Sequence, residues 1–192
     1  MAVEILSGAE GVWPVLFPRT PPGDVVVLLG SAVGSMQRLL EKGIRSANER
    51  KQGGQSIGKF QQVATKIVEM KLRVESARHM LYHFGWVAGH RKAVYLEAAM
   101  TKLHIADAWV KCAEDAIQIH GGYGYMTEYA VERELRDAIP SKRYSGTREI
   151  QRNIVYSLLA LRSRVELHGP RAAVPGDATL FATAIERGTV EG

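Results

Sequence analysis

Three side chains with metal-binding chemistry recur at four-residue intervals, namely Glu75, His79 and His83. In an α-helix this spacing places them on one face, and a carboxylate with two imidazoles is a ligand set that zinc accepts. The alternative is the solvated polar face of a long helix, which is the commoner arrangement. A di-iron bundle would need Glu-x-x-His pairs on other helices, and no such pair recurs. The pattern therefore favours a polar helix face, and we expect no metal site.

A glycine-rich turn, GGYG at residues 121–124, lies among three tyrosines, Tyr123, Tyr125 and Tyr129. It resembles a phosphate-binding loop only superficially, because no strand precedes it and it ends a helix instead of opening one. The glycines could let a ligand approach the backbone or could supply positive φ angles. The tyrosines could stack on a ligand or pack the loop onto the helices. The residue types alone favour the packing role.

Two adjacent cations, Arg50 and Lys51, end the first long apolar pattern. Cations at a helix C-terminus stabilise the helix dipole, which explains them without any ligand. The same charges could bind a pyrophosphate group. Both interpretations remain open from the residues alone.

Composition limits the classes of function. The chain has 192 residues and a formal net charge of +5, but its cations are spread and not interleaved with aromatic residues. Nucleic acid is therefore not an expected partner. Cys112 is the single cysteine, which indicates a reducing compartment, and it lies inside a helical pattern as a packed thiol. No segment is long and apolar enough to span a membrane, so we expect a cytoplasmic protein.

These residues need helices to position them, and the apolar periodicity predicts four. We expect residues 1–23 to be an irregular segment, 24–165 to be a bundle and 166–192 to be a mobile tail. Asp24 stands where an N-cap would precede the first helix. Apolar residues then recur at spacings of three and four in patterns beginning at Val26, Ile57, Leu96 and Ile150.

The connections between these patterns are short. Ser56 is expected to cap the second helix, Gly89 to end it and Thr147 to cap the last one, and a short helix is expected around residues 131–138. Because Gly30 and Gly34 destabilise the first helix, a close backbone or ligand should face them. No run alternates with period two, so no sheet is expected. The predicted fold is all-α, an antiparallel four-helix bundle.

Several ordered motifs resemble the acyl-CoA dehydrogenase family. They are ANERKQGGQSIGKFQ at residues 47–61, EAAMTKL at 97–103, QIHGGYGYMTEYAVERELRDA at 118–138 and YSGTREIQR at 144–152. Together they cover about residues 24–163, and their combination in this order is specific. The resemblance implies the C-terminal four-helix domain of that family, which agrees with the periodicity.

The resemblance also implies an activity and a cofactor. Family members dehydrogenate an acyl-CoA thioester between its α and β carbons, using a carboxylate base and FAD, and the helical domain helps to hold the FAD of a neighbouring subunit. By this resemblance Arg50 would contact the pyrophosphate, and Thr147 and Glu149 the adenosine part. The residues expected to line the FAD are Gln61, Gln118, Gly121 and Gly122.

Two departures from the family pattern complicate this assignment. Ser145 occupies the position of the usual catalytic glutamate, and a neutral hydroxyl cannot act as a base near neutral pH. Some branches carry the base on the first helix, and that position falls on Asp24. The chain is also about half the length of family members, which carry an N-terminal helical domain and a middle β-domain.

Two functions are consistent with these departures. The chain could work as an acyl-CoA dehydrogenase with the missing domains or with a partner chain that carries them. Alternatively, it could be a non-catalytic scaffold subunit or degenerate paralogue that completes a partner's FAD site. Both imply a homo- or hetero-oligomer, a dimer or a tetramer.

Overall fold

The computed structural model describes residues 22–90 and 94–159, with side chains from residue 28 onward. The expected irregular segment at 1–23 and tail at 166–192 therefore lie almost wholly outside the described residues. Three long helices dominate the described part, α3 (Pro22–Glu49), α4 (Gln61–His90) and α5 (Tyr95–His120). The shorter elements are β1 (Lys51–Gln52), β2 (Gln55–Ser56), η2 (Ile57–Lys59), η3 (Gly121–Tyr125), η4 (Thr127–Tyr129), α6 (Val131–Ala138), η5 (Ile139–Lys142) and α7 (Arg148–Leu158).

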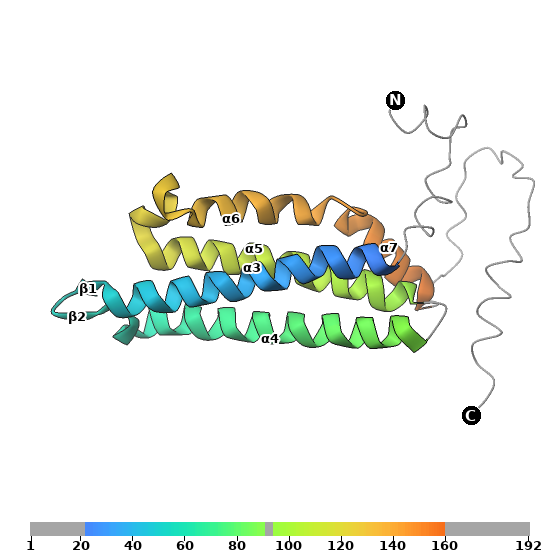
Figure 1. Ribbon diagram of the computed structural model, residues 1–192, viewed down its shortest axis with the longest axis horizontal. Helices are drawn as coiled ribbons and strands as arrows, with labels where there is room; N and C mark the ends of the chain where they lie inside the picture. Colours follow the sequence, from blue (N-terminus) through green and yellow to red (C-terminus); the bar gives the residue numbers. More distant parts are fainter. Residues whose placement is uncertain (1–21, 91–93, 160–192) are drawn as a thin grey trace, which may run out of the picture. The chain divides into compact units, whose positions relative to one another are not determined.

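The predicted helical bundle is confirmed, with one change to its fourth member. Helices α3, α4 and α5 pack against one another, and the two short helices α6 and α7 pack on α5 (Figure 1). Four long helices were expected, whereas within residues 22–90 and 94–159 the fourth position is shared between α6 and α7. Pro140, in η5, separates them because proline interrupts helical hydrogen bonding.

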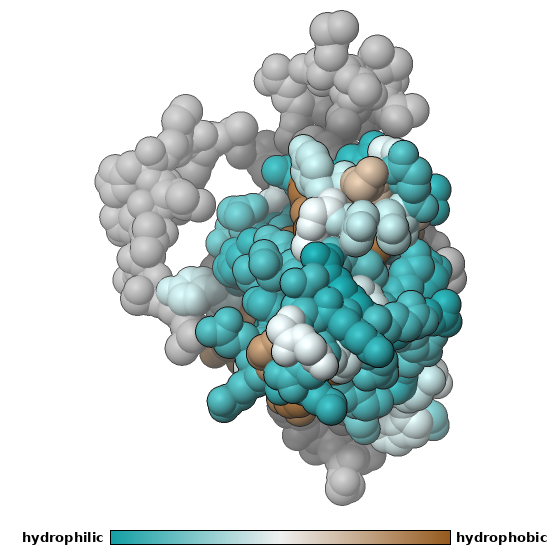
Figure 2. All heavy atoms as spheres, turned by 90° about the vertical axis from the view of Figure 1, so that its left-hand side faces the viewer, coloured by the Kyte–Doolittle hydropathy of each residue, from teal (hydrophilic) through white to brown (hydrophobic). Residues whose placement is uncertain are grey.

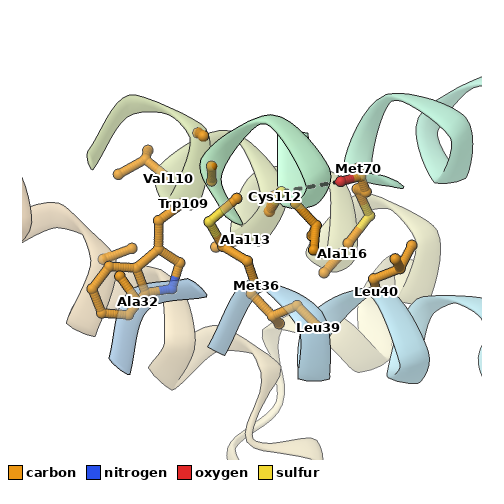
Figure 3. Close-up of a cluster of buried hydrophobic side chains, with 14 of the residues drawn as sticks. Ala32, Met36, Leu39, Leu40, Met70, Trp109, Val110, Cys112, Ala113 and Ala116 are labelled. Carbon is orange, nitrogen blue, oxygen red and sulfur yellow. Dashed lines mark hydrogen bonds between the residues drawn. The ribbon is translucent and has the colours of Figure 1, made fainter. Parts of the chain in front are cut away.

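The apolar stripes of the sequence meet in one core. Met36 and Leu39 of α3, Met70 of α4 and Cys112 of α5 are all fully buried. Figure 3 shows these side chains converging between the three helices, with alanines such as Ala113 filling the narrow space between them. Small residues let the helix backbones approach closely. The packed core therefore fixes the positions of the residues at both ends of the bundle.

A small hairpin contradicts the expectation of no sheet. Strands β1 and β2 pair antiparallel, with Lys51 opposite Ser56 and Gln52 opposite Gln55. The turn residues Gly53 and Gly54 have φ angles of 57° and 80°. Two successive positive φ angles are typical of the tight turn that joins two strands through two residues. The predicted loop is therefore a hairpin whose strands are too short to show a period of two.

The helix ends agree only in part with the predicted caps. Asp24 lies inside α3, which begins at Pro22, so it is not the N-cap. Ser56 makes no side-chain cap to η2, and Gly89 lies inside α4, which ends at His90. Thr147 does cap α7, because its side chain accepts a hydrogen bond from the Ile150 amide.

The glycine turn ends α5 as predicted, but the closest glycine packing is not where it was expected. Gly121 caps α5 with a φ angle of 61°. Outside their own helix, no described atom would lie within 4 Å of a Cβ at Gly30 or Gly34, so no described backbone faces them, and a ligand there stays a prediction. A Cβ at Gly124 would instead lie 2.5 Å from the Ile117 carbonyl oxygen. Close backbone packing therefore lies at the end of α5.

Candidate functional site

Arg50 anchors the end of the bundle where α3 and α5 both terminate. Its Nη1 donates a hydrogen bond to the His120 carbonyl oxygen over 2.9 Å, and its guanidinium lies 5.4 Å from the centre of the Tyr123 ring. A Cβ at Gly121 would lie 3.3 Å from the same Nη1. The glycine turn therefore accommodates the arginine, which retains further N–H donors for a ligand.

A pocket of about 450 Å³ opens beside this arginine. Two more cations on α3, Lys42 and Arg45, line it and form no ion pair with any described residue. Its other lining residues are Ser46, Glu49, Arg50, His120, Tyr123 and Tyr129. Three cations against a single carboxylate make the pocket suited to an anion, because unpaired cations attract negative groups at short range.

The tyrosines of the glycine turn have distinct roles. Tyr123 and Tyr129 stack with their ring centres 5.0 Å apart and form one wall of the pocket. This contact agrees with the expected packing role, and both residues remain about half exposed. Tyr125 points to solvent, with 83% of its surface exposed. Figure 2 shows this end of the bundle as predominantly hydrophilic.

The remaining residues expected to line FAD also lie at this end. Gln61 is the first residue of α4 and is exposed, and Gln118 is exposed in the last turn of α5. Gly122 is exposed, and beyond its chain neighbours no described atom would lie within 4 Å of a Cβ added there. The end of α3, the start of α4 and the end of α5 lie at the same end of the bundle (Figure 1). Arg50, Gln61, Gln118 and the glycines, which belong to these segments, therefore lie there too.

A second cluster surrounds the turn before α7. Ser145 has a φ angle of 50°, which is unusual for a residue with a side chain, and its carbonyl accepts a hydrogen bond of 2.9 Å from Gln151. Thr147 caps α7, and Glu149 follows in its first turn with its side chain exposed. Hydrogen bonds from its own backbone amide and from Thr147 lower the pKa of Glu149.

Lys102 of α5 contacts this turn through a hydrogen bond and an aromatic ring. Its ammonium donates a hydrogen bond to the Gly146 carbonyl and lies 6.0 Å from the centre of the Tyr144 ring. Burial lowers the pKa of Lys102 to about 8, because the charged form loses its water. Burial also raises the pKa of Tyr144 for the same reason.

The two clusters lie far apart on the same helix. Lys102 is near the start of α5 and Gln118 is in its last turn. At 1.5 Å of rise per residue, these positions are about 24 Å apart along the helix axis. The residues expected to bind FAD therefore form two separate groups on one chain.

Other candidate residues have structural explanations. Glu75 pairs with Lys71 and with Arg78, and the Nδ1–H group of His79 donates to the Glu75 carbonyl. No group of His, Cys, Asp or Glu within the described ranges could hold a metal ion. Cys112 is a packed thiol, as expected, and burial raises its pKa to about 12. None of the helices in the described ranges could cross a membrane.

Comparison with known proteins assigns the family. The sequence model described as "Acyl-CoA dehydrogenase, C-terminal domain" matches residues 26–159. The chain belongs to the acyl-CoA dehydrogenase family. It is similar to the probable acyl-CoA dehydrogenase YngJ of Bacillus subtilis strain 168, with 40% identity over 139 residues, 72% of this chain and 37% of the relative.

Solved structures of this family show the same arrangement of helices. The prolyl acyl carrier protein oxidase AnaB is 50% identical, with a TM-score of 0.73 over 79% of this chain and 40% of that protein. The FAD complex of PigA is 37% identical, with a TM-score of 0.74 over 81% of this chain and 40% of that protein. The chain thus spans about two fifths of the length of these relatives.

Ser145, which the resemblance predicts to stand in place of the usual base, is partly buried in its turn. The alternative base, Asp24, lies in the first turn of α3, and its side chain lies outside the described residues. The structure therefore gives Asp24 a backbone position but does not test its role.

Sequence reasoning missed three cations of these two clusters. Lys42 and Arg45 occupy positions that resemble a solvated helix face, and only the fold shows that they line a pocket. Lys102 offered a signal, because it falls on the apolar stripe of its helix between Ala99 and Ala106. A charged residue at a buried helical position indicates a specific partner.

Proposed function

We propose that this chain supplies the C-terminal helical domain of a FAD-dependent oxidoreductase that dehydrogenates an acyl thioester between its α and β carbons. It works together with an N-terminal helical domain and a β-domain, carried on the same longer protein or on a partner chain. Family membership supports this proposal, as does the length of the relatives, of which the chain spans about two fifths.

The observation that carries the proposal is the cationic pocket at Arg50. The guanidinium lies against Gly121, and Lys42 and Arg45 line the same pocket of about 450 Å³. Planar guanidinium groups bind phosphate oxygens with two parallel hydrogen bonds, so the donor set fits the diphosphate of FAD. Gln61, Gln118 and Gly122 border the same end of the bundle and would contact the neighbouring parts of that FAD.

The second cluster serves a different FAD molecule in this proposal. Thr147 and Glu149, at the N-terminus of α7, would contact the adenosine part through hydroxyl and carboxylate groups. Because the two clusters lie about 24 Å apart along α5, one chain contributes to two FAD sites. This arrangement requires an oligomer, a dimer or a tetramer, in which each helical domain completes the site of a neighbour.

The chemistry needs a base and an acceptor. FAD, when bound, accepts the hydride that leaves the β carbon. The α-proton must be taken by a carboxylate, because the Ser145 hydroxyl holds its proton at neutral pH. We assign this role to Asp24 on α3, because a carboxylate is a group that can accept the proton.

A second candidate function is a non-catalytic subunit that completes the FAD site of a partner without contributing a base. Ser145 favours it, because this chain lacks a carboxylate at the usual position.

Two classes of substrate are candidates for the complete enzyme. One relative of known structure acts, by its name, on a prolyl group held by a carrier protein, so a carrier-bound aminoacyl thioester is an alternative to an acyl-CoA.

The deciding experiment is reconstitution of the chain with the missing domains, supplied by the neighbouring reading frame or by the corresponding domains of a relative. We expect the complex to retain flavin and to lose flavin absorbance when an acyl-CoA or a prolyl-carrier protein is added. Asp24→Asn should abolish this reduction while flavin is retained, and the matched variant Ser145→Ala should leave it unchanged. Reduction that survives Asp24→Asn would exclude Asp24 as the base, and a complex that binds no flavin would overturn the proposed function.

A further inference from the structure

The ring of His120, the last residue of α5, is held by its own helix. Its Nδ1 lies 2.7 Å from the carbonyl oxygen of Ala116, one turn earlier. Because a carbonyl oxygen only accepts hydrogen bonds, Nδ1 must carry a proton. This contact fixes the tautomer of the neutral ring, so Nε2 is the nitrogen that has no proton when the ring is uncharged.

The second ring nitrogen of His120 has no partner and is open to solvent. Nε2 makes no hydrogen bond to any described residue. It is not among the fully buried side-chain atoms without a partner, so it is accessible although only 8% of the residue is exposed. His120 lines the pocket beside Arg50. A nearly buried imidazole with a free nitrogen, in the wall of a pocket, indicates a ligand-binding residue.

An anion in this pocket requires the protonated form of the ring. In the neutral ring Nε2 offers a lone pair, and phosphate oxygens also offer only lone pairs, so the two groups repel each other. In the imidazolium both nitrogens donate. The Nε2–H group then donates to a phosphate oxygen while the Nδ1–H group keeps its bond to Ala116.

The other groups of the pocket couple this protonation to the ligand. The charged and titratable side chains that line it with His120 are Lys42, Arg45, Glu49 and Arg50 from α3, Tyr123 from η3 and Tyr129 from η4. Three of them are cations and one is a carboxylate, so the empty pocket opposes a further positive charge on His120. A bound diphosphate brings negative charge and favours it. The ring therefore gains its proton as the anion binds.

We propose that His120 is a binding residue of this pocket, and that the pocket takes up a proton at Nε2 of His120 when it binds a diphosphate. This inference rests on the proposed function and adds a pH-dependent residue to its FAD site. Because the complex holds the extra proton, affinity falls as pH rises through the range in which imidazoles titrate, by at most about tenfold per pH unit. Acidification thus favours retention of the diphosphate, and a rise in pH favours its release.

Calorimetric titration of the 192-residue chain with ADP-ribose tests the proton uptake. The diphosphate of ADP-ribose, like that of FAD, is esterified at both ends, so its charge stays constant while imidazoles titrate. We expect its association constant to fall at least about fivefold between about pH 6 and 8. The measured heat should also differ between two buffers of different ionisation enthalpy. Affinity that is independent of pH, or equal heats in the two buffers, would overturn the inference.

A pair of glutamine variants assigns the proton to one residue. His120→Gln offers an uncharged donor that does not titrate, so we expect the pH dependence of ADP-ribose binding to disappear. His79→Gln is the matched control, because Nδ1 of His79 lies 2.7 Å from the Glu75 carbonyl oxygen in the same way, but His79 does not line the pocket. Circular dichroism checks the fold of both variants. If folded His120→Gln keeps the wild-type pH dependence, another group takes up the proton and the assignment to His120 is wrong.

Nuclear magnetic resonance of the wild-type chain decides the same point without a variant. The chemical shifts of the ring nitrogens distinguish the protonated from the neutral imidazole. We expect saturating ADP-ribose to raise the protonated fraction of His120 at neutral pH and to leave that of His79 unchanged. A protonated fraction of His120 that ADP-ribose does not alter would contradict the proposal, even if His120→Gln fails to fold.

Competition separates this inference from the assignment of the ligand. FAD and coenzyme A both contain a diphosphate esterified at both ends, and we expect FAD to displace ADP-ribose at the lower concentration. Stronger displacement by coenzyme A would overturn the FAD assignment and leave the proton uptake of His120 intact. Preference for FAD without pH dependence would do the reverse. A chain that binds no ADP-ribose at any pH refutes the role of His120, whereas flavin reduction in the reconstituted complex decides the proposed function independently.

Discussion

Lys102 of helix α5 donates a hydrogen bond to the main-chain carbonyl of Gly146, in the turn that leads into α7. Only 3% of the lysine is exposed, so its ammonium is almost completely removed from water. The contact ties the turn that carries Ser145 to the first part of α5. A buried cation therefore holds the turn that leads into α7.

The buried ammonium should make stability depend on pH. Because the pKa of Lys102 is about 8 in the folded chain and near 10.5 when unfolded, the unfolded chain binds more protons between these values. The free energy of unfolding should therefore rise as pH increases from 8, by up to about 3 kcal/mol in total. Lys102→Met should remove this rise, as measured by urea denaturation at a series of pH values.

The titration of Cys112 limits the pH range in which the effect of Lys102 can be measured alone, and a Cys112 variant supplies a control. Burial raises its pKa to about 12 from 9 in the unfolded chain, so it stabilises the fold below pH 9 and loses this contribution as pH rises further. Its effect opposes that of Lys102 above pH 9. Cys112→Ala should therefore leave the rise between pH 8 and 9 intact. If wild-type stability is flat in that interval, Lys102 is not the titrating group.

Gly124, just after α5, packs too closely against the backbone to accept a side chain. A Cβ at Gly124 would lie 2.5 Å from the Ile117 carbonyl oxygen and 2.9 Å from its Cα. Both atoms belong to the backbone and cannot move aside, so Gly124→Ala should destabilise the chain by about 3 kcal/mol. Gly122→Ala is the matched control, because no described atom lies within 4 Å of its added Cβ. Thermal unfolding should show a large loss for the first variant and almost none for the second.

The helices were predictable because their burial is periodic along the chain. The spacing of three and four that includes Met36 predicted its burial, and the short helix at 131–138 has the predicted bounds. The hairpin was missed because strands of two residues are too short to show alternation. Its turn glycines, Gly53 and Gly54, were the available signal.

The candidate site was predictable only where a motif fixed it. Arg50 and Gly121 were expected at one FAD-binding surface, and the structure brings them into contact. The pocket cations Lys42 and Arg45 were missed because exposed helical cations usually face only water. Their proximity to Arg50 depends on how α3 meets the end of α5. Contacts between residues of different helices cannot be predicted from the spacing of residues within one helix.

Arg50 has both a structural and a ligand-binding role, and variants can separate them. Arg50→Ala removes the hydrogen bond to the His120 carbonyl and the contact with the Tyr123 ring, so it should cost about 1–2 kcal/mol of stability. Arg45→Ala should leave stability unchanged, because Arg45 forms no ion pair with a described residue. Both variants should weaken binding of inorganic pyrophosphate in calorimetric titrations. Unchanged pyrophosphate binding in Arg45→Ala would remove Arg45 from the anion pocket.

A buried carboxylate on α6 depends on one arginine of α3. Glu134 is only 4% exposed, and its Oε1 accepts hydrogen bonds of 3.2 and 2.5 Å from Nε and Nη2 of Arg38. Its Oε2 is buried and has no hydrogen-bond partner within the described ranges. Removal of the arginine alone would leave an uncompensated buried charge. Arg38→Met should therefore destabilise the chain by about 2 kcal/mol, less than a fully buried pair because Arg38 is half exposed.

A double-mutant cycle distinguishes the charge from the packing. Arg38→Met combined with Glu134→Met removes both charges and keeps apolar volume between α3 and α6, so its stability should lie within about 1 kcal/mol of the wild type. Lys111→Met is the surface control, because the pair of Lys111 and Glu114 is exposed within one helix and should contribute nothing measurable. Chemical denaturation of the wild type, Arg38→Met, Glu134→Met and the double variant gives the coupling energy. A double variant as unstable as the sum of its single variants would show that Arg38 and Glu134 do not act as a pair, and that α6 is held to α3 by other contacts.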